Sequence, residues 1–454
     1  MNINGRTKVL GIFGNPVKHT LSPDIHNYLG KKLGINSCYV PFPVDDLKKA
    51  VEGAYSMGVS GLNVTVPFKE SVIPYLSEID PDAKNIGAVN TLVRTGNGFK
   101  GYNTDMPGLL RALSVSGVSL KDKNVIILGA GGAARAALYM AVKEGASLVF
   151  LINRTLEKAV SLADEINKIF DKNVIKPVKA DNISIIPKER YIMIQCTSLG
   201  LKKEDGLLIE DDSFYEMADY GYDLIYNPAI TPFIEKMMEH AVPCDNGLKM
   251  LLYQGIIAYE LWNDINVSSE LSETVYNNLC KKLYGDNIIL TGYMGSGKSA
   301  VGKKISVLYG MDFIDTDEYI VEKEGMSINE IFERFGEDTF RKMETEALRE
   351  LSVKCYNTVI ATGGGIVLRK ENVNILKDTG KIYYLMASPE EIYNRIQYDT
   401  TRPLLKSGSS DEVKEKIKTM MEQRRAYYDM SCDIKIETDG KTPEEIVELV
   451  YSAL

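Results

Sequence analysis

The chain has 454 residues, 44% hydrophobic and 25% charged, which are ordinary values for globular proteins and leave room for about three domains. Its 53 basic and 62 acidic residues give a formal net charge of −9, which argues against nucleic acid as the main partner. No apolar run approaches the roughly 20 residues of a membrane span, and Met1 to Lys8 lack the apolar core of a signal peptide, so we expect a cytoplasmic protein without membrane contact. The six cysteines are scattered without a Cys-x-x-Cys pair, so we expect neither a disulfide framework nor a zinc site.

The segment from Lys8 to Asp105 predicts alternating strands and helices. Residues 8–13 (KVLGIF) and 61–66 (GLNVTV) are short apolar runs typical of strands, and residues 45–54 are spaced like an amphipathic helix. In open α/β sheets ligands collect at the carboxyl ends of strands. The polar residues that follow such ends here are Thr65, Lys69, Asn90 and Asp105. A lysine beside an aspartate can transfer a proton, although an isolated pair of this kind is more often a surface salt bridge.

Residues 123–152 predict the strand, glycine loop, helix and strand of a dinucleotide-binding half-fold. Residues 123–128 (KNVIIL) are apolar without alternation, as in a parallel strand buried on both faces, and lead into the loop 129–136 (GAGGAARA). Such a loop alone can serve only tight packing. After the next strand come Asn153, Arg154, Thr155 and Lys158. An NAD site would place an acidic residue there, whereas the cations Arg154 and Lys158 suit the 2′-phosphate of NADP, so we favour NADP. The alternative is that these residues are only the solvated start of a helix.

A second, different glycine loop lies further along the chain. Residues 247–264 predict a helix that contains the single tryptophan, and the polar stretch 267–286 predicts a domain boundary. The strand 287–290 (NIIL) then leads into residues 292–299 (GYMGSGKS). This loop fits the pattern GxxxxGK[ST], in which backbone N–H groups cradle phosphates, the lysine reaches the β/γ oxygens and the hydroxyl binds Mg²⁺. The predicted nucleoside triphosphate site comprises Gly295, Ser296, Gly297, Lys298, Ser299 and Ala300.

Two carboxylates end the next predicted strand, residues 313–317 (FIDTD). A strand would place Asp315 and Asp317 on the same side of the chain, because side chains two residues apart share a face. One of them can then enter the metal shell while the other meets an acceptor hydroxyl. Either aspartate alone would be equally well explained as a helix cap.

Five motifs within residues 1–275 resemble the successive signatures of shikimate dehydrogenases. They are GIFGNPVKHTLSPDIHN (11–27), NVTVPFK (63–69), GAVNTL (87–92), YNTD (102–105) and GLKMLLYQ (247–254). The resemblance implies reduction of 3-dehydroshikimate by NADPH without a metal, with Lys69 and Asp105 as the proton-transfer pair. It implies further that Thr20 and Ser22 hold the substrate carboxylate and that Thr65, Asn90, Tyr226 and Gln254 contact the ring hydroxyls. The cofactor would lie against Gly129, Ala130, Gly131, Gly132, Ala133, Asn153, Arg154, Thr155, Lys158 and Gly247.

Residues 286–454 resemble shikimate kinases. The resemblance rests on the second glycine loop and on FGEDTFR (335–341), ATGGG (361–365), TRPLL (401–405) and RRAYY (424–428). It implies that shikimate binds Asp317, Arg341, Gly364 and Arg424. The two arginines would take the carboxylate, with Arg425 as the alternative to Arg424, and Asp317 would face the attacking hydroxyl. It also implies that Arg402 reaches the ATP phosphates from a lid and that Ser299 and Asp315 hold Mg²⁺.

We therefore predict an α/β chain: a two-lobed dehydrogenase with a Rossmann-type NADP domain, followed by a P-loop kinase domain with a parallel sheet. The expected bounds are a substrate-binding lobe at 1–110 with a returning helical segment at 240–275, an NADP-binding lobe at 111–239, a linker at 276–286 and the kinase at 287–454. The two reactions are consecutive, so we interpret the chain as a bifunctional shikimate-pathway enzyme that uses NADP(H), ATP and Mg²⁺ on small-molecule substrates.

Alternatives remain open at this point. The first half could prefer quinate, and the second could be an ATP-sensing module that regulates the first. Covalent linkage alone does not establish channelling of shikimate between the sites, and the oligomeric state is open, a homo-oligomer included.

Overall fold

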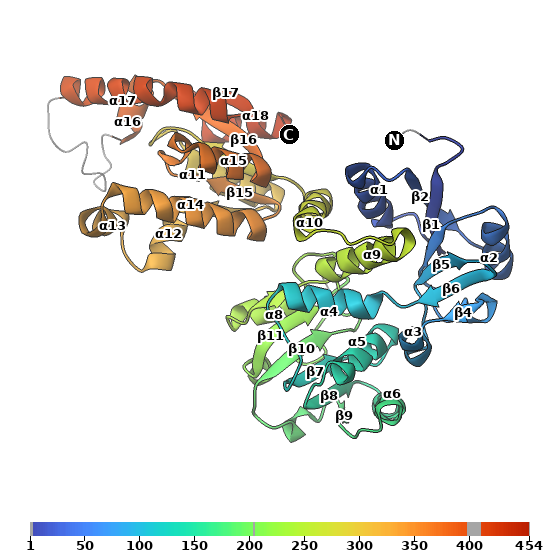
Figure 1. Ribbon diagram of the computed structural model, residues 1–454. Helices are drawn as coiled ribbons and strands as arrows, with labels where there is room; N and C mark the ends of the chain where they lie inside the picture. The colour runs from blue at the N-terminus through green and yellow to red at the C-terminus, as the bar shows by residue number, and fades with distance from the viewer. Residues whose placement is uncertain (1–2, 203–204, 397–409, 454) are drawn as a thin grey trace. The chain divides into compact units, whose positions relative to one another are not determined.

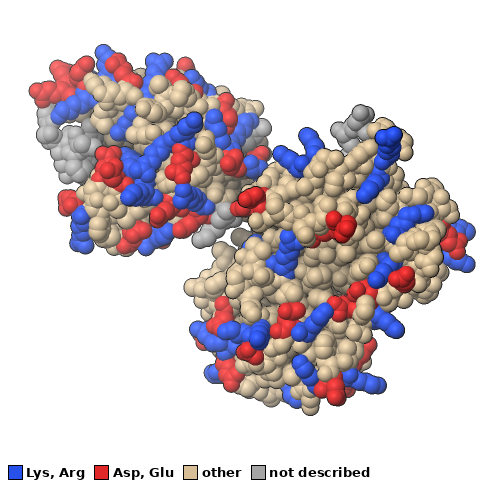
Figure 2. Space-filling model, viewed as in Figure 1, with Lys and Arg blue, Asp and Glu red and all other residues tan. Residues whose placement is uncertain are grey.

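The computed structural model describes residues 3–202, 205–396 and 410–453, which form three sheets with covering helices (Figure 1). The chain divides into two compact units, Met1–Leu279 and Cys280–Leu454. Among the described helices, none combines the length and apolar character needed to traverse a membrane. On the face drawn in Figure 2, basic and acidic side chains are interspersed on both units.

The first lobe of the first unit is built on a mixed six-stranded sheet with the order β2-β1-β3-β5-β6-β4. Strand β1 pairs in parallel with β2 and β3, whereas β5 runs antiparallel to β3 and β6. The alternating βα pattern expected from the sequence therefore covers only the first three strands. The elements of this lobe are β1 (Lys8–Gly14), α1 (Ser22–Leu33), β2 (Ser37–Pro43), α2 (Leu47–Ser56), β3 (Gly61–Val64), β4 (Glu78–Ile79), α3 (Pro81–Ile86), β5 (Thr91–Thr95) and β6 (Gly98–Tyr102).

The second lobe carries a parallel six-stranded sheet with the order β12-β11-β10-β7-β8-β9. Strand β7 is buried along most of its length, which explains its apolar run without alternation. The strands are β7 (Asn124–Leu128), β8 (Leu148–Asn153), β9 (Ile175–Lys179), β10 (Tyr191–Gln195), β11 (Ala218–Asp223) and β12 (Cys244–Asp245). The helices along this part of the chain are α4 (Asp105–Val115), α5 (Gly132–Lys143), α6 (Leu156–Phe170), α7 (Asp212–Tyr215), α8 (Pro232–Glu239) and α9 (Leu248–Asn263), of which α9 returns to the first lobe.

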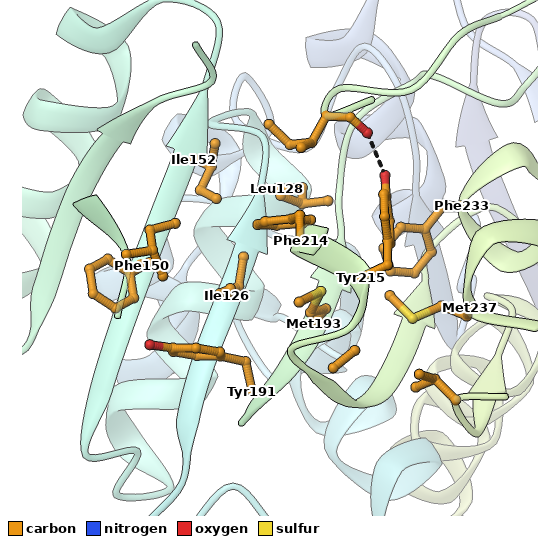
Figure 3. Packing of buried hydrophobic residues seen from close by; sticks show 14 of the residues in the cluster. Ile126, Leu128, Phe150, Ile152, Tyr191, Met193, Phe214, Tyr215, Phe233 and Met237 are labelled. Atoms are coloured by element: carbon orange, nitrogen blue, oxygen red, sulfur yellow. Dashed lines mark hydrogen bonds between the residues drawn. The ribbon is translucent and has the colours of Figure 1, made fainter. Parts of the chain in front are cut away.

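One face of this sheet packs against buried aromatic and aliphatic side chains (Figure 3). Tyr215 lies fully buried among them, and its hydroxyl donates a 2.7 Å hydrogen bond to the Ile209 carbonyl, so the polar group is satisfied inside the core. Residues 240–247 lie outside the returning helix predicted at 240–275. Strand β12 pairs with β11 in the second sheet, and the helix that returns to the first lobe, α9, begins only at Leu248.

The second unit has a parallel five-stranded sheet with the order β14-β15-β13-β16-β17. Its strands are β13 (Asn287–Thr291), β14 (Asp312–Asp315), β15 (Thr358–Ala361), β16 (Gly380–Met386) and β17 (Ile434–Glu437). Its helices are α11 (Lys298–Tyr309), α12 (Thr316–Glu324), α13 (Ile328–Phe335), α14 (Glu337–Lys354), α15 (Lys370–Thr379), α16 (Pro389–Ile396), α17 (Ser410–Ser431) and α18 (Pro443–Ser452). The central strand β13 is buried throughout and leads into the second glycine loop.

The linker expected at 276–286 is helical over most of its length, because α10 (Ser269–Tyr284) runs through it. The Ser268 hydroxyl accepts a hydrogen bond from the backbone N–H of Leu271 at the start of the helix. Ser272, Val275 and Leu279 are buried at helical spacing. This spacing is easily missed in a stretch of polar composition, which is why the sequence suggested only a boundary.

Candidate active sites

A cavity of about 930 Å³ in the first unit is lined by residues of both lobes. All eight residues predicted to contact substrate or move protons line it, although they come from distant parts of the chain: Thr20, Ser22, Thr65, Lys69, Asn90, Asp105, Tyr226 and Gln254. Three of the predicted cofactor residues also line it: Gly132, Ala133 and Gly247.

Lys69 and Asp105 form an ion pair inside this cavity. The Lys69 Nζ atom lies 2.6 Å from Asp105 Oδ2, and the Asn90 amide donates a 2.9 Å hydrogen bond to Asp105 Oδ1. The side chains of Lys69 and Asp105 are 33% and 18% exposed, so a ligand in the cavity can reach both. Asp105 is also the first residue of α4, where the helix N-terminus favours a negative charge. Asn90 and the N-terminus of α4 therefore keep the ion pair in place inside the cavity, so it differs from an isolated surface salt bridge.

A buried hydrogen-bond network fixes the orientation of the Asn90 amide. The Asn90 oxygen accepts hydrogen bonds from the backbone N–H of Thr104 at 2.7 Å and from the hydroxyls of Thr91 and Thr104, both at 3.1 Å. Thr91 is bonded in turn by the Asn63 amide, whose oxygen accepts from the Tyr39 hydroxyl at 2.7 Å. With its oxygen so occupied, Asn90 presents its NH₂ group to Asp105.

The two predicted carboxylate-binding hydroxyls are neighbours at the start of α1. The Thr20 hydroxyl donates to Ser22 Oγ at 3.1 Å, and the backbone N–H of Ser22 donates to Thr20 Oγ1 at 3.2 Å. Both side chains line the cavity, so two hydroxyls that can reorient toward a ligand lie side by side there. Such a group of donors suits a carboxylate.

Close contact between α4 and α9 brings Gln254 toward the same cavity. A Cβ atom on Gly108 would lie 2.8 Å from the backbone nitrogen of Gln254, so a side chain at position 108 would push the helices apart. Tyr226 reaches the cavity after β11, and burial raises the pKa of its hydroxyl, which keeps it a neutral donor at physiological pH.

The first glycine loop has the shape that a pyrophosphate requires. Gly129 has φ +106°, and a Cβ there would lie 3.0 Å from Thr197 Cγ2, so glycine is required on two grounds. Around Gly131 and Gly132 a Cβ would meet no atom within 4 Å, which leaves open space beside the N-terminus of α5. A dinucleotide phosphate suits this space, because the first N–H groups of a helix have no intrahelical partner and can donate to an anion.

Candidate 2′-phosphate ligands follow the neighbouring strand β8. Arg154, Thr155 and Lys158 are exposed at the start of α6, and the Asn153 amide donates to the Thr155 carbonyl at 2.9 Å, which shapes the turn. Because β7 and β8 are paired in parallel, this turn and the glycine loop lie at the same edge of the sheet. Two cations there match a phosphate on the ribose.

The second glycine loop encloses the N-terminus of α11. Gly292, Gly295 and Gly297 have φ values of +153°, +78° and +95°. The Lys298 ammonium donates to the carbonyls of Gly292 at 2.8 Å and Tyr293 at 3.1 Å, so it lies across the loop. The Ser299 hydroxyl donates to Asp315 Oδ2 at 2.6 Å. A hydroxyl and a carboxylate side by side form the oxygen donor set that Mg²⁺ prefers, so these residues fit that metal.

Asp315 and Asp317 do not lie along one strand as predicted. Strand β14 ends at Asp315, which caps α12 by accepting a 3.0 Å hydrogen bond from the backbone N–H of Asp317. The chain therefore turns between them, and the strand alternation no longer applies. The two carboxylates have different neighbours, because a Cβ on Gly363 would lie 2.5 Å from Asp317 Oδ1 while Asp315 binds Ser299.

Arg341 reaches the glycine segment 363–365 from α14. Its guanidinium pairs with Glu344 at 2.7 Å and Glu337 at 2.9 Å, and a Cβ on Gly365 would collide with it. Glu344 is only 1% exposed. Burial raises the pKa of the Glu344 carboxyl, although Arg341 acts in the opposite direction.

Arg424 and Arg425 lie side by side on α17 but have different surroundings. The Arg425 side chain is 76% exposed and pairs with Asp429 at 3.7 Å. Tyr428 donates a 2.5 Å hydrogen bond to the Gly364 carbonyl; burial raises the pKa of this hydroxyl, and the positive charges of Arg424 and Arg341 partly oppose that effect. Arg424 precedes Tyr428 by four residues and therefore lies on the same face of α17 as the tyrosine that binds Gly364.

Comparison with known proteins covers both units. Family models match residues 12–92 (shikimate dehydrogenase substrate binding domain), 111–199 (shikimate / quinate 5-dehydrogenase) and 294–454 (shikimate kinase). The shikimate dehydrogenase (NADP(+)) of Carboxydothermus hydrogenoformans is 40% identical over 269 residues, which are 59% of this chain and 95% of that protein. The chain belongs to the shikimate dehydrogenase family. Its C-terminal unit carries a shikimate kinase domain, so the chain is a bifunctional enzyme of the shikimate pathway.

Solved structures agree with the fold of the dehydrogenase. That of shikimate dehydrogenase from Aquifex aeolicus is 38% identical with a TM-score of 0.54, and covers 60% of this chain and 99% of its own. Shikimate 5-dehydrogenase from Thermus thermophilus, crystallised with NADP(H) and shikimate, is 28% identical with a TM-score of 0.53. The match covers 60% of this chain and 99% of that protein. These findings confirm the predicted fold class, the two activities and the NADP and ATP dependence.

In the dehydrogenase, the sequence reasoning missed the supporting residues Tyr39, Asn63 and Thr104. Asn63 and Thr104 lie inside motifs that were recognised, so their position was the available signal. In the kinase domain it missed Glu344, three residues after Arg341 and therefore on the same face of α14. Arg402, predicted to contact ATP phosphates, lies outside the described residues.

Proposed function

We propose that Lys69 and Asp105 handle the proton when the dehydrogenase reduces 3-dehydroshikimate to shikimate. The observation that carries this proposal is the 2.6 Å ion pair, held by Asn90, in a cavity lined by every predicted substrate residue. NADPH supplies the hydride to C3 of the substrate. Lys69 donates a proton to the oxygen on that carbon as negative charge develops there, and Asp105 keeps the lysine oriented beforehand.

The remaining cavity residues orient the substrate. Thr20 and Ser22 bind its carboxylate at the start of α1, opposite the hydroxyl contacts of Thr65, Asn90, Tyr226 and Gln254. Arg154 and Lys158 select NADP over NAD through the 2′-phosphate, and the loop at 129–133 binds the pyrophosphate. The proposed roles supply a carboxylate site, a proton donor and a phosphate loop, which a reductase for an acidic cyclic ketone needs.

In the kinase domain, we assign the acceptor side to Asp317, Arg341, Gly364 and Arg424. Asp317 orients the attacking hydroxyl of shikimate, and the two arginines take its carboxylate. Lys298 binds the phosphates of ATP, and Ser299 and Asp315 would hold Mg²⁺, which supplies positive charge to the transferring phosphoryl group. The role of Arg402 stays a prediction.

A coupled assay on the full chain tests both activities. With 3-dehydroshikimate, NADPH, ATP and Mg²⁺, we expect loss of NADPH and release of ADP, and without NADPH we expect ADP release only when shikimate is added. NADPH loss without any ADP release on shikimate would favour an ATP-sensing regulatory module. Equal turnover of quinate with NAD⁺ would contradict the proposed specificity.

Location, assembly and domain bounds are further proposals. We infer that the enzyme is cytoplasmic, which cell fractionation tests. Size-exclusion chromatography with light scattering tests whether it forms a homo-oligomer. Separate expression of residues 1–284, which keep α10 intact, and of residues 287–454 tests whether each catalytic domain is active alone.

A further inference from the structure

We infer that Arg135 is a positioning residue of the dehydrogenase, which ties the nucleotide-binding lobe to the segment that carries Asn90. The inference rests on the proposed function of the cavity. Arg135 lies in the first turn of α5, within the glycine-loop segment 129–136, and it does not line the cavity. Its contacts reach in two directions.

On the nucleotide side, Arg135 is held by α6. Its two terminal nitrogens lie 2.6 Å and 2.5 Å from the carboxylate oxygens of Glu165, which is a bidentate ion pair. Helix α6 begins directly after the turn that bears Arg154. Glu165 therefore fixes the guanidinium relative to both elements expected to bind NADP.

On the substrate side, Arg135 binds the C-terminal end of α3. Its Nε donates to the carbonyl of Ile86, and Nη2 donates to the carbonyl of Asn85 at 3.4 Å. These are carbonyls that the end of a short helix leaves without intrahelical partners. Gly87 follows with φ +75°, and a Cβ on it would lie 3.6 Å from Arg135 Nη2, so the guanidinium is in contact with the backbone turn itself.

The segment that follows this turn contacts both members of the proton-transfer pair. The backbone N–H of Val89 donates to the Lys69 carbonyl at 2.8 Å, and Asn90 donates to Asp105. The Asn103 amide donates to the Ala88 carbonyl at 3.0 Å, and its oxygen accepts from the backbone N–H of Asp105 at 3.1 Å. A shift of the turn at residues 86–87 would therefore move the proton donor relative to the bound nucleotide.

A second contact between the same helices offers a matched control. The Tyr139 hydroxyl donates to Asp82 at 2.9 Å and accepts from the Asn85 amide at 3.2 Å, and Lys143 pairs with Asp82 at 2.5 Å. Figure 1 shows α3 beside α5, where these contacts lie. This second cluster joins the lobes through side chains of α3 and does not contact the backbone turn at Gly87.

The test compares Arg135→Met, Arg135→Lys and Tyr139→Phe in the full chain. We measure kcat and both KM values with 3-dehydroshikimate and NADPH, and the isotope effect with NADPH deuterated at the transferred hydrogen. The unfolding temperature of the dehydrogenase unit shows whether each variant is folded, and phosphorylation of shikimate by the same preparation measures the amount of active full chain.

For Arg135→Met we expect kcat to fall about 10- to 100-fold with little change in either KM, because a misplaced donor slows the reaction more than it weakens binding. The isotope effect should rise as hydride transfer becomes limiting. Arg135→Lys should recover part of kcat, since an ammonium can still donate to one carbonyl, and Tyr139→Phe should keep kcat near wild type.

Three results would overturn the inference alone while the wild type remains active. They are an unchanged kcat in Arg135→Met, a loss confined to the KM for NADPH, or an equal loss of kcat in Tyr139→Phe. A wild-type chain that does not reduce 3-dehydroshikimate would overturn the proposed function and this inference with it.

Discussion

Asp223 should make the stability of the dehydrogenase unit depend on pH. It is the last residue of β11, its side chain is fully buried, and burial raises the pKa of its carboxyl from 3.8 to about 7. Hydrogen bonds from the Thr231 hydroxyl at 2.6 Å and the backbone N–H of Ile225 at 2.9 Å lower the pKa in part. The folded chain therefore holds a proton between these two pKa values that the unfolded chain has released.

The sign of the effect follows from this difference. At pH values well below 3.8 both states are protonated and Asp223 contributes nothing, whereas the folded state becomes less stable as the pH rises from there toward 7. At roughly 1.4 kcal/mol per pH unit, the full penalty above pH 7 is about 4 kcal/mol, of which about 3 kcal/mol develops between about pH 5 and pH 8.

Asp223→Asn removes the ionisation and keeps an oxygen that can accept from Ile225. The substitution should lower the free energy of unfolding by about 1 kcal/mol at every pH, because the Thr231 hydroxyl loses its acceptor. Between about pH 5 and pH 8, the free energy of unfolding of the variant should therefore fall by about 3 kcal/mol less than that of the wild type. Denaturant unfolding followed by the fluorescence of Trp262, the single tryptophan, reports on this unit because Trp262 is buried in α9. Parallel pH profiles of the two proteins would refute the reasoning.

Three further substitutions test the assigned residues. Lys69→Ala should lower the kcat of the dehydrogenase about 100-fold or more while kinase activity is kept, because the proton donor acts in the transition state; retained reduction of 3-dehydroshikimate would remove Lys69 from that role. Arg424→Ala should raise the KM for shikimate about tenfold or more with little change for ATP, as expected on loss of a charge-assisted contact; the same effect in Arg425→Ala, and none in Arg424→Ala, would reverse the assignment. Glu344→Gln should lower kcat/KM for shikimate about tenfold, because it releases Arg341 from a 2.7 Å ion pair; an unchanged value in steady-state assays would show that Glu344 serves only packing.

Contacts between distant residues could not be read from the chain. The ion pair of Lys69 and Asp105 joins residues 36 positions apart. Without the family motifs a surface salt bridge was the better explanation of an isolated pair, and only the resemblance to shikimate dehydrogenases implied the proton-transfer pair. The choice between Arg424 and Arg425 depends on the rotation of α17, which is set by packing of Tyr428. The different neighbours of Asp315 and Asp317 follow from the end of β14, and strand ends depend on pairing with other strands.

The sequence by itself determined the two nucleotide loops and the two enzyme families. A phosphate loop is a local structure, in which glycines with positive φ and a following helix lie within one short segment, so its residues can be recognised in order. Only the tertiary structure decided which side chains meet across the cavity, that residues 269–284 form a helix, and that Arg135 joins α6 to the turn before Asn90. These features depend on burial and on contacts between distant segments, and no short stretch of sequence contains both partners.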